Sequence, residues 1–157
     1  MTTETQNRAT TFAHLQKTAN YEIGDSQMFW AKFFEIFSLD ITTRVKFEYR
    51  ITKQDGTKGR IDGFWKGVLL IEQKSRGEDL QKAYQQAHSY LGGLADDELP
   101  DYILVCDFQN FHLYNRKRDN DCHKFTLAEL LQNLHLFNFM TDKKFQLPLN
   151  ESGCFTR

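Results

Sequence analysis

The sequence predicts an α/β fold in which a central mixed β-sheet is flanked by α-helices. Hydrophobic periodicity along the chain indicates the order α-β-β-β-α-β-β-α, which favours a layered domain built on one sheet. The 157 residues fit a single domain that needs no disulfide or metal in order to fold. Apolar residues make up 40% of the chain and include 14 phenylalanines, which supply large buried surfaces.

Elements in the first half of the chain follow from the spacing of apolar residues. Aromatic residues recur at helical spacing after Asp25 and Ser26, either of which is an acceptable N-cap, so we expect an α-helix ending near Ser38. Apolar and charged side chains alternate over residues 45–51, which is the period of a half-buried strand. Two more strands, joined by a short hairpin turn, are predicted over residues 60–65 and 67–74.

In the second half, Glu78 or Asp79 can begin a helix over residues 80–91, and Gly92 and Gly93 follow its end. The remaining expectations are strands over residues 102–106 and 111–114, a charged loop over 116–121 and a final amphipathic helix over 127–137.

Composition and charge exclude several classes of protein. A formal net charge of −1 does not by itself indicate a nucleic-acid-binding protein, because such proteins usually carry a basic excess. The three cysteines show no CxxC spacing, which argues against a structural zinc site and against a secreted disulfide framework. The longest uninterrupted apolar run, residues 68–71, is too short to span a membrane. We expect a soluble, cytoplasmic protein.

Asp62, Glu72 and Lys74 form the constellation that carries chemistry. On a hairpin centred near Gly67, positions 62 and 72 lie opposite each other, and directly opposed residues have Cβ atoms about 5 Å apart. Glu72 and Lys74 are two residues apart on one strand and therefore share a face. That face continues an apolar stripe that leads into the core.

Two carboxylates this close repel each other and are costly beside a core strand unless a cation relieves the repulsion. Oxygen ligands with room for water and phosphate suit Mg²⁺, for which Mn²⁺ can substitute. Such a cation activates water for attack on a phosphodiester, and Lys74 could orient the water, deprotonate it or stabilise charge on the phosphate. The alternative is that Glu72 and Lys74 form a solvated ion pair where a strand leaves the core.

The residues around this constellation resemble the PD-(D/E)xK nuclease superfamily, in which a hairpin carries D…(D/E)xK and the next helix packs over the site. Residues 59–65 (Gly-Arg-Ile-Asp-Gly-Phe-Trp) and 69–75 (Leu-Leu-Ile-Glu-Gln-Lys-Ser) are similar to the amino-terminal nuclease domain of single-chain type II (IIG/IIL) restriction–modification enzymes. The strings 104–111 and 130–140 also resemble that domain. The resemblance covers residues 20–145 and implies a restriction-endonuclease-like fold with Mg²⁺-dependent DNA cleavage.

The resemblance assigns roles residue by residue. Asp62 and Glu72 correspond to the metal ligands, and Lys74 corresponds to the catalytic lysine. Gln86 and Tyr90 match the QxxxY motif of the RecB-like branch and lie one helical turn apart. They would position the lysine or contact the DNA backbone; the alternative is a tyrosine packed in the core beside a surface glutamine.

Further candidates surround the motif. Gln73 is a candidate metal ligand, and so is an acid before the first helix, Glu22 or Asp25, although either could instead cap that helix. We favour Glu22 as the ligand. Asp107 follows a strand at a turn, where we expect its side chain to accept hydrogen bonds from nearby backbone. The candidate DNA-phosphate contacts are Arg60, Lys66, Arg76 and Lys82.

Relative to those enzymes, the chain shows no glycine-rich cofactor loop and no NPPY-like methyltransferase motif. The implied organisation is a flexible, partly frayed segment over residues 1–19, a nuclease domain over 20–145, and a tail or linker start over 146–157. The implied partners are double-stranded DNA, methyltransferase and target-recognition domains in the same polypeptide, and a second copy that pairs transiently for double-strand cleavage. Without those parts we expect weak or no activity.

Two other functions stay open at this point. One is a stand-alone repair or junction-processing nuclease of the same fold. The other is a non-catalytic domain that binds DNA or a protein, against which the intact Asp62, Glu72 and Lys74 argue.

Overall fold

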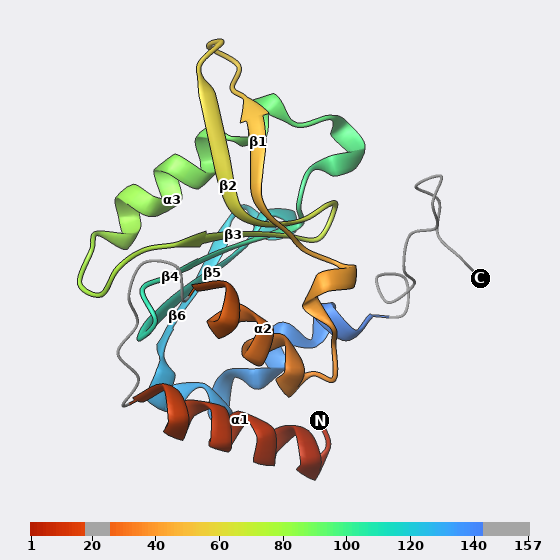
Figure 1. The fold of residues 1–157 in the computed structure, drawn as a ribbon, viewed down its shortest axis with the longest axis vertical. Coiled ribbons are helices and arrows are strands. Elements are labelled where there is room, and N and C mark those ends of the chain that lie inside the picture. Colours follow the sequence, from red (N-terminus) through yellow and green to blue (C-terminus); the bar gives the residue numbers. More distant parts are fainter. Residues whose placement is uncertain (18–25, 143–157) are drawn as a thin grey trace. The chain divides into compact units, whose positions relative to one another are not determined.

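A computed structural model describes residues 1–17 and 26–142 of the chain. These residues divide into two compact units, which are drawn together in Figure 1. The first, here called the sheet unit, comprises residues 45–127. The second, here called the helical unit, comprises residues 1–44 and the residues from 128 onward. In the described ranges, no helix is both long and apolar enough to cross a membrane.

The sheet unit contains a six-stranded mixed sheet in the order β1-β2-β3-β4-β5-β6, so the predicted α/β fold with a mixed sheet is confirmed. Neighbouring strands run antiparallel except β3 and β4, which run parallel and are connected through helix α3. The bounds are β1 Lys46–Thr52, β2 Lys58–Trp65, β3 Leu69–Gln73, α3 Leu80–Ser89, β4 Tyr102–Cys106, β5 Asn110–Asn115 and β6 Asp121–Thr126.

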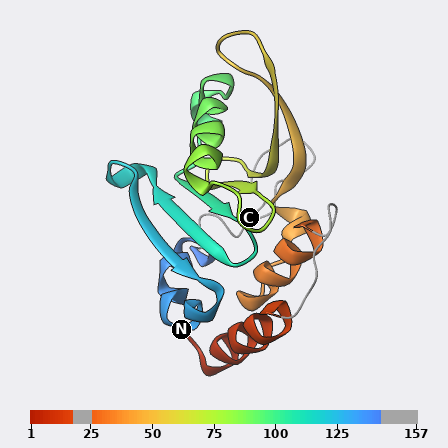
Figure 2. The ribbon, with the colours of Figure 1, turned by 90° about the vertical axis from the view of Figure 1, so that its left-hand side faces the viewer.

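Helix α3 covers one face of the sheet unit and lies beside the β1–β2 hairpin (Figures 1 and 2). Of the two predicted N-cap candidates, Glu78 and Asp79, Asp79 is the N-cap, because its carboxylate accepts hydrogen bonds from the backbone N–H groups of Gln81 and Lys82. Ala83 and Ala87 of the helix pack into a core with the central residues of β2, β3 and β4. This packing holds the exposed face of α3 next to the end of β3.

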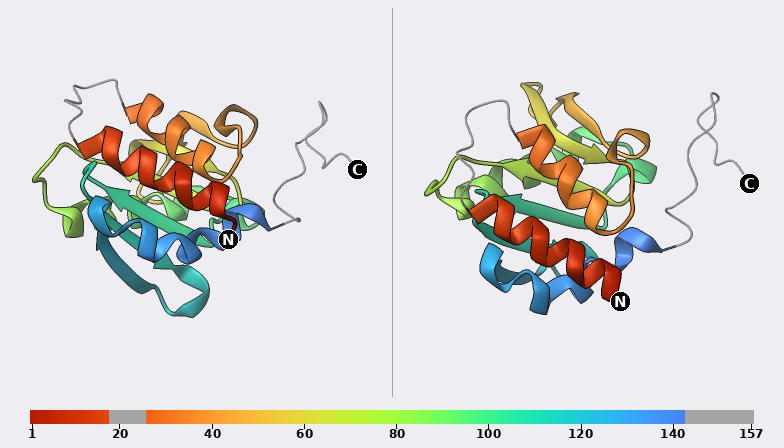
Figure 3. Two further views of the ribbon diagram at one scale, coloured as in Figure 1. Left: turned by 90° about the horizontal axis from the view of Figure 1, so that it is seen from below. Right: turned by 60° about the horizontal axis from the view of Figure 1, so that its bottom comes forward.

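The helical unit is built on α1 Thr3–Lys17 and α2 Ser26–Ile36, which pack side by side (Figure 3). The prediction of a flexible segment over residues 1–19 is therefore corrected for residues 3–17, which form a helix. Phe12 of α1 packs against Phe29 and Phe33 of α2, with ring centroids 5.3 and 5.8 Å away. Only two of the four buried α1 residues, Ala9 and Phe12, are apolar. The sequence of this helix therefore lacks the apolar stripe at helical spacing by which a helix is predicted.

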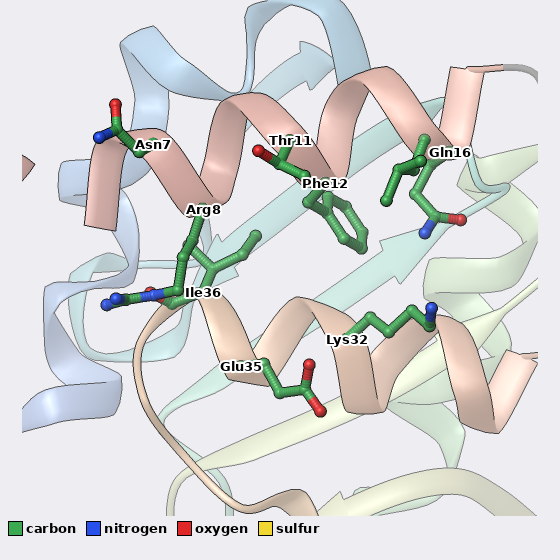
Figure 4. A pocket seen from close by; sticks show the side chains of 9 residues that line it. Asn7, Arg8, Thr11, Phe12, Gln16, Lys32, Glu35 and Ile36 are labelled. Carbon is green, nitrogen blue, oxygen red and sulfur yellow. The ribbon is translucent and has the colours of Figure 1, made fainter. Parts of the chain in front are cut away.

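A shallow hollow of about 310 Å³ lies between α1 and α2 (Figure 4). Its lining combines apolar Phe12 and Ile36 with the charged side chains of Arg8, Lys32 and Glu35. It contains none of the predicted site residues.

The final helix differs from the prediction in type. Residues 127–137 were expected to form an amphipathic α-helix, but the chain forms the 3-10 helices η5 Leu127–Glu129 and η6 Leu131–Thr141. Buried Leu134, Phe137 and Met140 recur every three residues, which matches three residues per turn in a 3-10 helix.

The predicted charged loop over residues 116–121 is also corrected. The chain forms a short 3-10 helix, η4 Arg116–Arg118, and then enters β6, an edge strand that the sequence analysis missed. Phe125 is the only fully buried side chain of β6, so the strand lacks the apolar alternation by which strands are recognised. Its pairing with β5 and the stacking of Phe125 on Phe111 hold it in the sheet.

The turn after α3 yields a first test of this fold. A Cβ atom on Gly93 would lie 2.3 Å from the backbone oxygen of Thr52, whereas a Cβ on Gly92 would meet only the side chain of Gln54. We expect Gly93→Ala to lower the free energy of unfolding by about 2 kcal/mol, because backbone must shift. Gly92→Ala is the matched control and should cost less than about 0.5 kcal/mol, since an exposed side chain can move. Urea denaturation measures both; equal losses would contradict the close approach of Gly93 to β1.

Candidate active site

The β2–β3 hairpin brings Asp62 and Glu72 together. Its register pairs Gly63 with Ile71 and Phe64 with Leu70, and continuation of this register places Asp62 opposite Glu72. A carboxylate oxygen of Asp62 accepts a hydrogen bond of 2.8 Å from the backbone N–H of Gln73. This bond ties the Asp62 side chain to the last residue of β3, beside Glu72.

Glu72 is an ionisable residue in a position that otherwise belongs to the core. The residue is 2% exposed. One carboxylate oxygen, Oε1, lies 3.3 Å from Nζ of Lys74, whereas the other, Oε2, is buried with no hydrogen-bond partner. Burial, and then the negative charge of Asp62, raise the pKa of Glu72 to about 8 against the weaker opposing effect of Lys74. A buried carboxylate with an unsatisfied oxygen is costly unless it takes up a proton or a cation.

Asp62 is half-buried and shares this environment. Burial raises the pKa of its carboxyl, although the hydrogen bond from Gln73 and the charges of Lys74 and Arg60 partly offset that effect. Burial thus raises the pKa of both carboxyls, because removal from water disfavours their charged forms.

Lys74 is held between β3 and α3 by a chain of polar contacts. Its Nζ donates a hydrogen bond of 2.8 Å to Oε1 of Gln86, in addition to its ion pair with Glu72. Nε2 of Gln86 in turn donates to the hydroxyl of Tyr90 at 2.8 Å. The predicted site residues Glu72, Lys74, Gln86 and Tyr90 therefore form one continuous network, in which Gln86 contacts Lys74 directly and Tyr90 contacts Gln86.

Tyr90 belongs to the core through its ring and to the site through its hydroxyl. The residue is 3% exposed and packs with α3 and β2. A Cβ on Gly59 would lie 2.8 Å from the Tyr90 ring, so glycine at this position of β2 lets the ring approach the strand backbone. The ring of Tyr90 is therefore packed in the core, while its hydroxyl accepts a hydrogen bond from Gln86.

Lys53 is a neighbour of the site that the sequence analysis missed. Its Nζ lies 5.2 Å from the centroid of the Tyr90 ring, and its charge acts on Glu72. Lys53 lies in the β1–β2 turn, 19 positions before Glu72, so no local spacing in the sequence signals this contact. Gly59, which directly precedes the predicted strand over residues 60–65, was the one feature of the sequence that indicated a close packing contact here.

The donor set fits a cation that keeps part of its water shell. Among residues 1–17 and 26–142, no group of three or more His, Cys, Asp or Glu side chains is placed to hold a metal ion. Asp62 and Glu72 supply two carboxylates, and the unsatisfied Oε2 of Glu72 is an oxygen in need of a partner. Mg²⁺ commonly binds through one or two carboxylates and completes its octahedron with water and substrate phosphate. Glu22 and Asp25 lie outside the described residues.

The loop after Lys74 is anchored by Asp107. Its buried carboxylate accepts hydrogen bonds from the backbone N–H groups of Gln109 and Asn110, as predicted, and also from that of Gly77. The last of these bonds fixes the loop that leads from Lys74 to α3. Asp107 therefore holds the loop beside Lys74 in place.

The four residues that were predicted to contact DNA phosphates lie in different parts of the sheet unit. Arg60 is exposed on β2 and lies 3.9 Å from Glu48, and its charge reaches Asp62. Arg76 and Lys82 are exposed, in the loop after Lys74 and on α3 respectively. Lys66 lies at the opposite end of β2, in the turn, where it pairs with Glu98 at 3.2 Å and covers the Tyr49 ring. Of the four, only Arg60 has a charge that acts on a site carboxylate, whereas Lys66 is paired with Glu98 away from the site.

Comparison with known proteins identifies the family. The model of the family described as MmeI, N-terminal domain, matches residues 4–156. The chain belongs to the MmeI N-terminal domain family. This membership confirms the predicted resemblance to the amino-terminal domain of type II restriction–modification enzymes.

Other comparisons add less to this assignment. The solved "cryoEM structure DrdV-DNA complex" matches with a TM-score of 0.49 and 18% sequence identity over 87% of this chain. The chain spans 13% of the length of that structure's chain. A search of curated proteins found no match.

Proposed function

We propose that this member of the MmeI N-terminal domain family is the metal-dependent endonuclease module of a type II restriction–modification enzyme. The module would hydrolyse phosphodiester bonds of double-stranded DNA. One observation carries the proposal: Glu72 is buried, has an unsatisfied carboxylate oxygen, and lies between the carboxylate of Asp62 and the ammonium group of Lys74. The alternative, a solvated ion pair between Glu72 and Lys74, does not explain why Glu72 is only 2% exposed.

Asp62 and Glu72, with an oxygen of Gln73, would hold a Mg²⁺ ion, for which Mn²⁺ can substitute. When bound, such an ion supplies Lewis-acid activation of water and charge stabilisation at the scissile phosphate. The chain's own contribution is to fix the two carboxylates on paired strands. Because Gln73 donates its backbone N–H to Asp62, one carboxylate oxygen is oriented before any ligand arrives.

Lys74 is the group that would contact the reacting atoms. A lysine ammonium has three N–H donors, and the contacts with Glu72 and Gln86 account for two. The third can be donated to an oxygen of the scissile phosphate or to the attacking water. Gln86 is a positioning residue in this scheme, since it holds Nζ of Lys74 and is itself held by the Tyr90 hydroxyl.

The near-neutral charge of the chain is compatible with a module that receives its DNA from linked domains. A formal net charge of −1 offers little unspecific affinity for a polyanion. Methyltransferase and target-recognition domains in the same polypeptide would raise the effective concentration of DNA at the site. Transient pairing of two such modules would allow cleavage of both strands.

Calorimetric titration of Mn²⁺ into the wild-type chain and Asp62→Ala tests the metal site directly. We expect one Mn²⁺ site in the wild type and at least a hundredfold weaker binding in Asp62→Ala, because even outer-shell changes cost about 10–100-fold. Asp97→Ala is the matched control, since Asp97 is exposed in the η3 helix Asp96–Glu98, and it should bind Mn²⁺ as the wild type does.

Plasmid nicking measured in parallel separates the outcomes. Mn²⁺ binding that disappears in Asp62→Ala establishes the site even where nicking by the chain alone is slow. Unchanged binding in Asp62→Ala would contradict the proposal. Absence of binding in the wild type, with and without duplex DNA, would favour a non-catalytic DNA- or protein-binding domain.

A further inference from the structure

The β1–β2 hairpin extends beyond the rest of the sheet. The pairing of β2 with β3 ends at Gly63, whereas β1 and β2 pair with each other as far as Thr52 and Lys58. Figure 1 shows this outer part of the hairpin projecting past the end of β3, next to α3. It has one buried face, where Ile51 and Ile61 pack in the core that includes α3.

The other face of the hairpin carries directly opposed positive charges. Arg50 pairs with Arg60 across the two strands, and the next pair on the same face joins Thr52 to Lys58. All four side chains are exposed. Like charges directly opposite each other destabilise an antiparallel pair. Protein stability therefore does not account for the choice of arginine at both positions.

These basic side chains have few partners of their own. Arg60 approaches Glu48 at 3.9 Å, and Nζ of Lys58 donates to the Thr52 hydroxyl at 2.9 Å. Within the described ranges, Arg50 makes no ion pair or side-chain hydrogen bond. The strand residues 50–52 and 58–60 together line an open hollow of about 720 Å³. The face is thus positively charged and only partly neutralised.

We propose that this outer face of the β1–β2 hairpin, formed by Arg50, Lys58 and Arg60, binds the phosphate backbone of duplex DNA and holds it beside the carboxylate pair. The proposal rests on the proposed function, because it places the same substrate at the same site. Arg60 lies two residues from Asp62, a span of about 6.7 Å along a strand. A backbone held at Arg60 therefore passes close to Asp62.

Charge and geometry favour duplex DNA as the occupant. Duplex DNA carries one negative charge per roughly 1.7 Å of helix axis, so an extended basic strip meets several phosphates. Guanidinium groups bind phosphate oxygens through two parallel hydrogen bonds, and two arginines facing each other across a hairpin can grip one phosphate from both sides.

The test compares DNA binding by the wild-type chain and the double variant Arg50→Gln/Arg60→Gln. Fluorescence anisotropy with a labelled duplex of about 25 base pairs, in EDTA and across a salt series, reports affinity without cleavage. Each phosphate contact contributes about 0.9 to the slope of log K against log salt, so the variant should lose about two from that slope. At 0.1 M salt this corresponds to roughly tenfold weaker binding per arginine.

The matched control is Arg118→Gln/Lys124→Gln, which removes the same charge from exposed residues of η4 and β6. It should bind DNA within about twofold of the wild type. The melting temperature of Arg50→Gln/Arg60→Gln should equal or exceed that of the wild type, because the opposed charges are gone. The melting temperature shows that the variant is folded, and equal losses of DNA binding in the two double variants would overturn the proposal.

Two further measurements distinguish a failure of this inference from a failure of the proposed function. Mn²⁺ calorimetry on the single variant Arg50→Gln should match the wild type, whereas Arg60→Gln removes a charge that acts on Asp62. Weaker DNA binding by Arg50→Gln with unchanged Mn²⁺ binding therefore keeps the DNA-binding result separate from a failed metal site. Polyglutamate competing as well as unlabelled duplex, at equal charge, would show a surface for acidic protein rather than for DNA. A wild-type chain that binds no duplex even at 50 mM salt would refute the proposal.

Discussion

Lys74→Met is expected to lower the rate of plasmid nicking in the presence of Mn²⁺ by about 10²–10³-fold. This is the usual loss when one donor that stabilises charge in a transition state is removed. The measurement is initial nicking rate under single-turnover conditions, in this chain or in a longer polypeptide that contains it. Lys124→Met is the matched control, because Lys124 is an exposed lysine of β6.

Variants of Gln86 separate the chemistry of Lys74 from its positioning. Gln86→Leu removes the 2.8 Å acceptor of Nζ, and we expect a loss of about tenfold. Gln86→Glu keeps an oxygen that accepts from the lysine and should retain more activity than Gln86→Leu. Nicking by Lys74→Met at the wild-type rate would remove this residue from the site. Equal losses in Gln86→Leu and Gln86→Glu would contradict its positioning role.

Local patterns in the sequence predicted the parts of the fold in which side-chain period and burial agree. The strand over residues 45–51 alternates strictly, and Asp79 precedes a helix with a clear apolar face, so both were found. The hairpin register followed from the short turn at Gly67, which fixes the pairing on both sides. For the same reason, the contact between Asp62 and β3 was predictable from spacing alone.

The rest depended on contacts that no local pattern carries. Helix α1 buries Thr5 and Gln16 along with its two apolar residues, so its stripe is not apolar. Strand β6 is held by backbone pairing with β5 and has one fully buried side chain. The contact of Lys53 with Tyr90 joins residues 37 positions apart, through the packing of α3 on the hairpin.

The pH dependence of stability is expected to reveal Glu72 in the metal-free protein. The folded chain keeps the Glu72 proton up to a pKa of about 8, whereas the unfolded chain releases it near 4.5. Between these values the unfolded state binds fewer protons than the folded state, so stability falls as pH rises. From pH 5 to pH 8 the loss attributable to Glu72 should approach about 4 kcal/mol, or roughly 8–16 °C in melting temperature.

Glu72→Gln should flatten this dependence, because an amide has the shape of the carboxyl and no charge to bury. In EDTA, thermal unfolding of Glu72→Gln should therefore show a higher melting temperature than the wild type at pH 8, and a similar one at pH 5. Exposed Glu78 provides the control, since Glu78→Gln should follow the wild-type curve. Mn²⁺ at a hundred times its dissociation constant should restore about 2.7 kcal/mol to the wild type at pH 8, and much less to Glu72→Gln. A wild-type curve as flat as that of Glu72→Gln would mean that Glu72 is ionised and solvated in solution, which would remove the physical reason for a cation at this site.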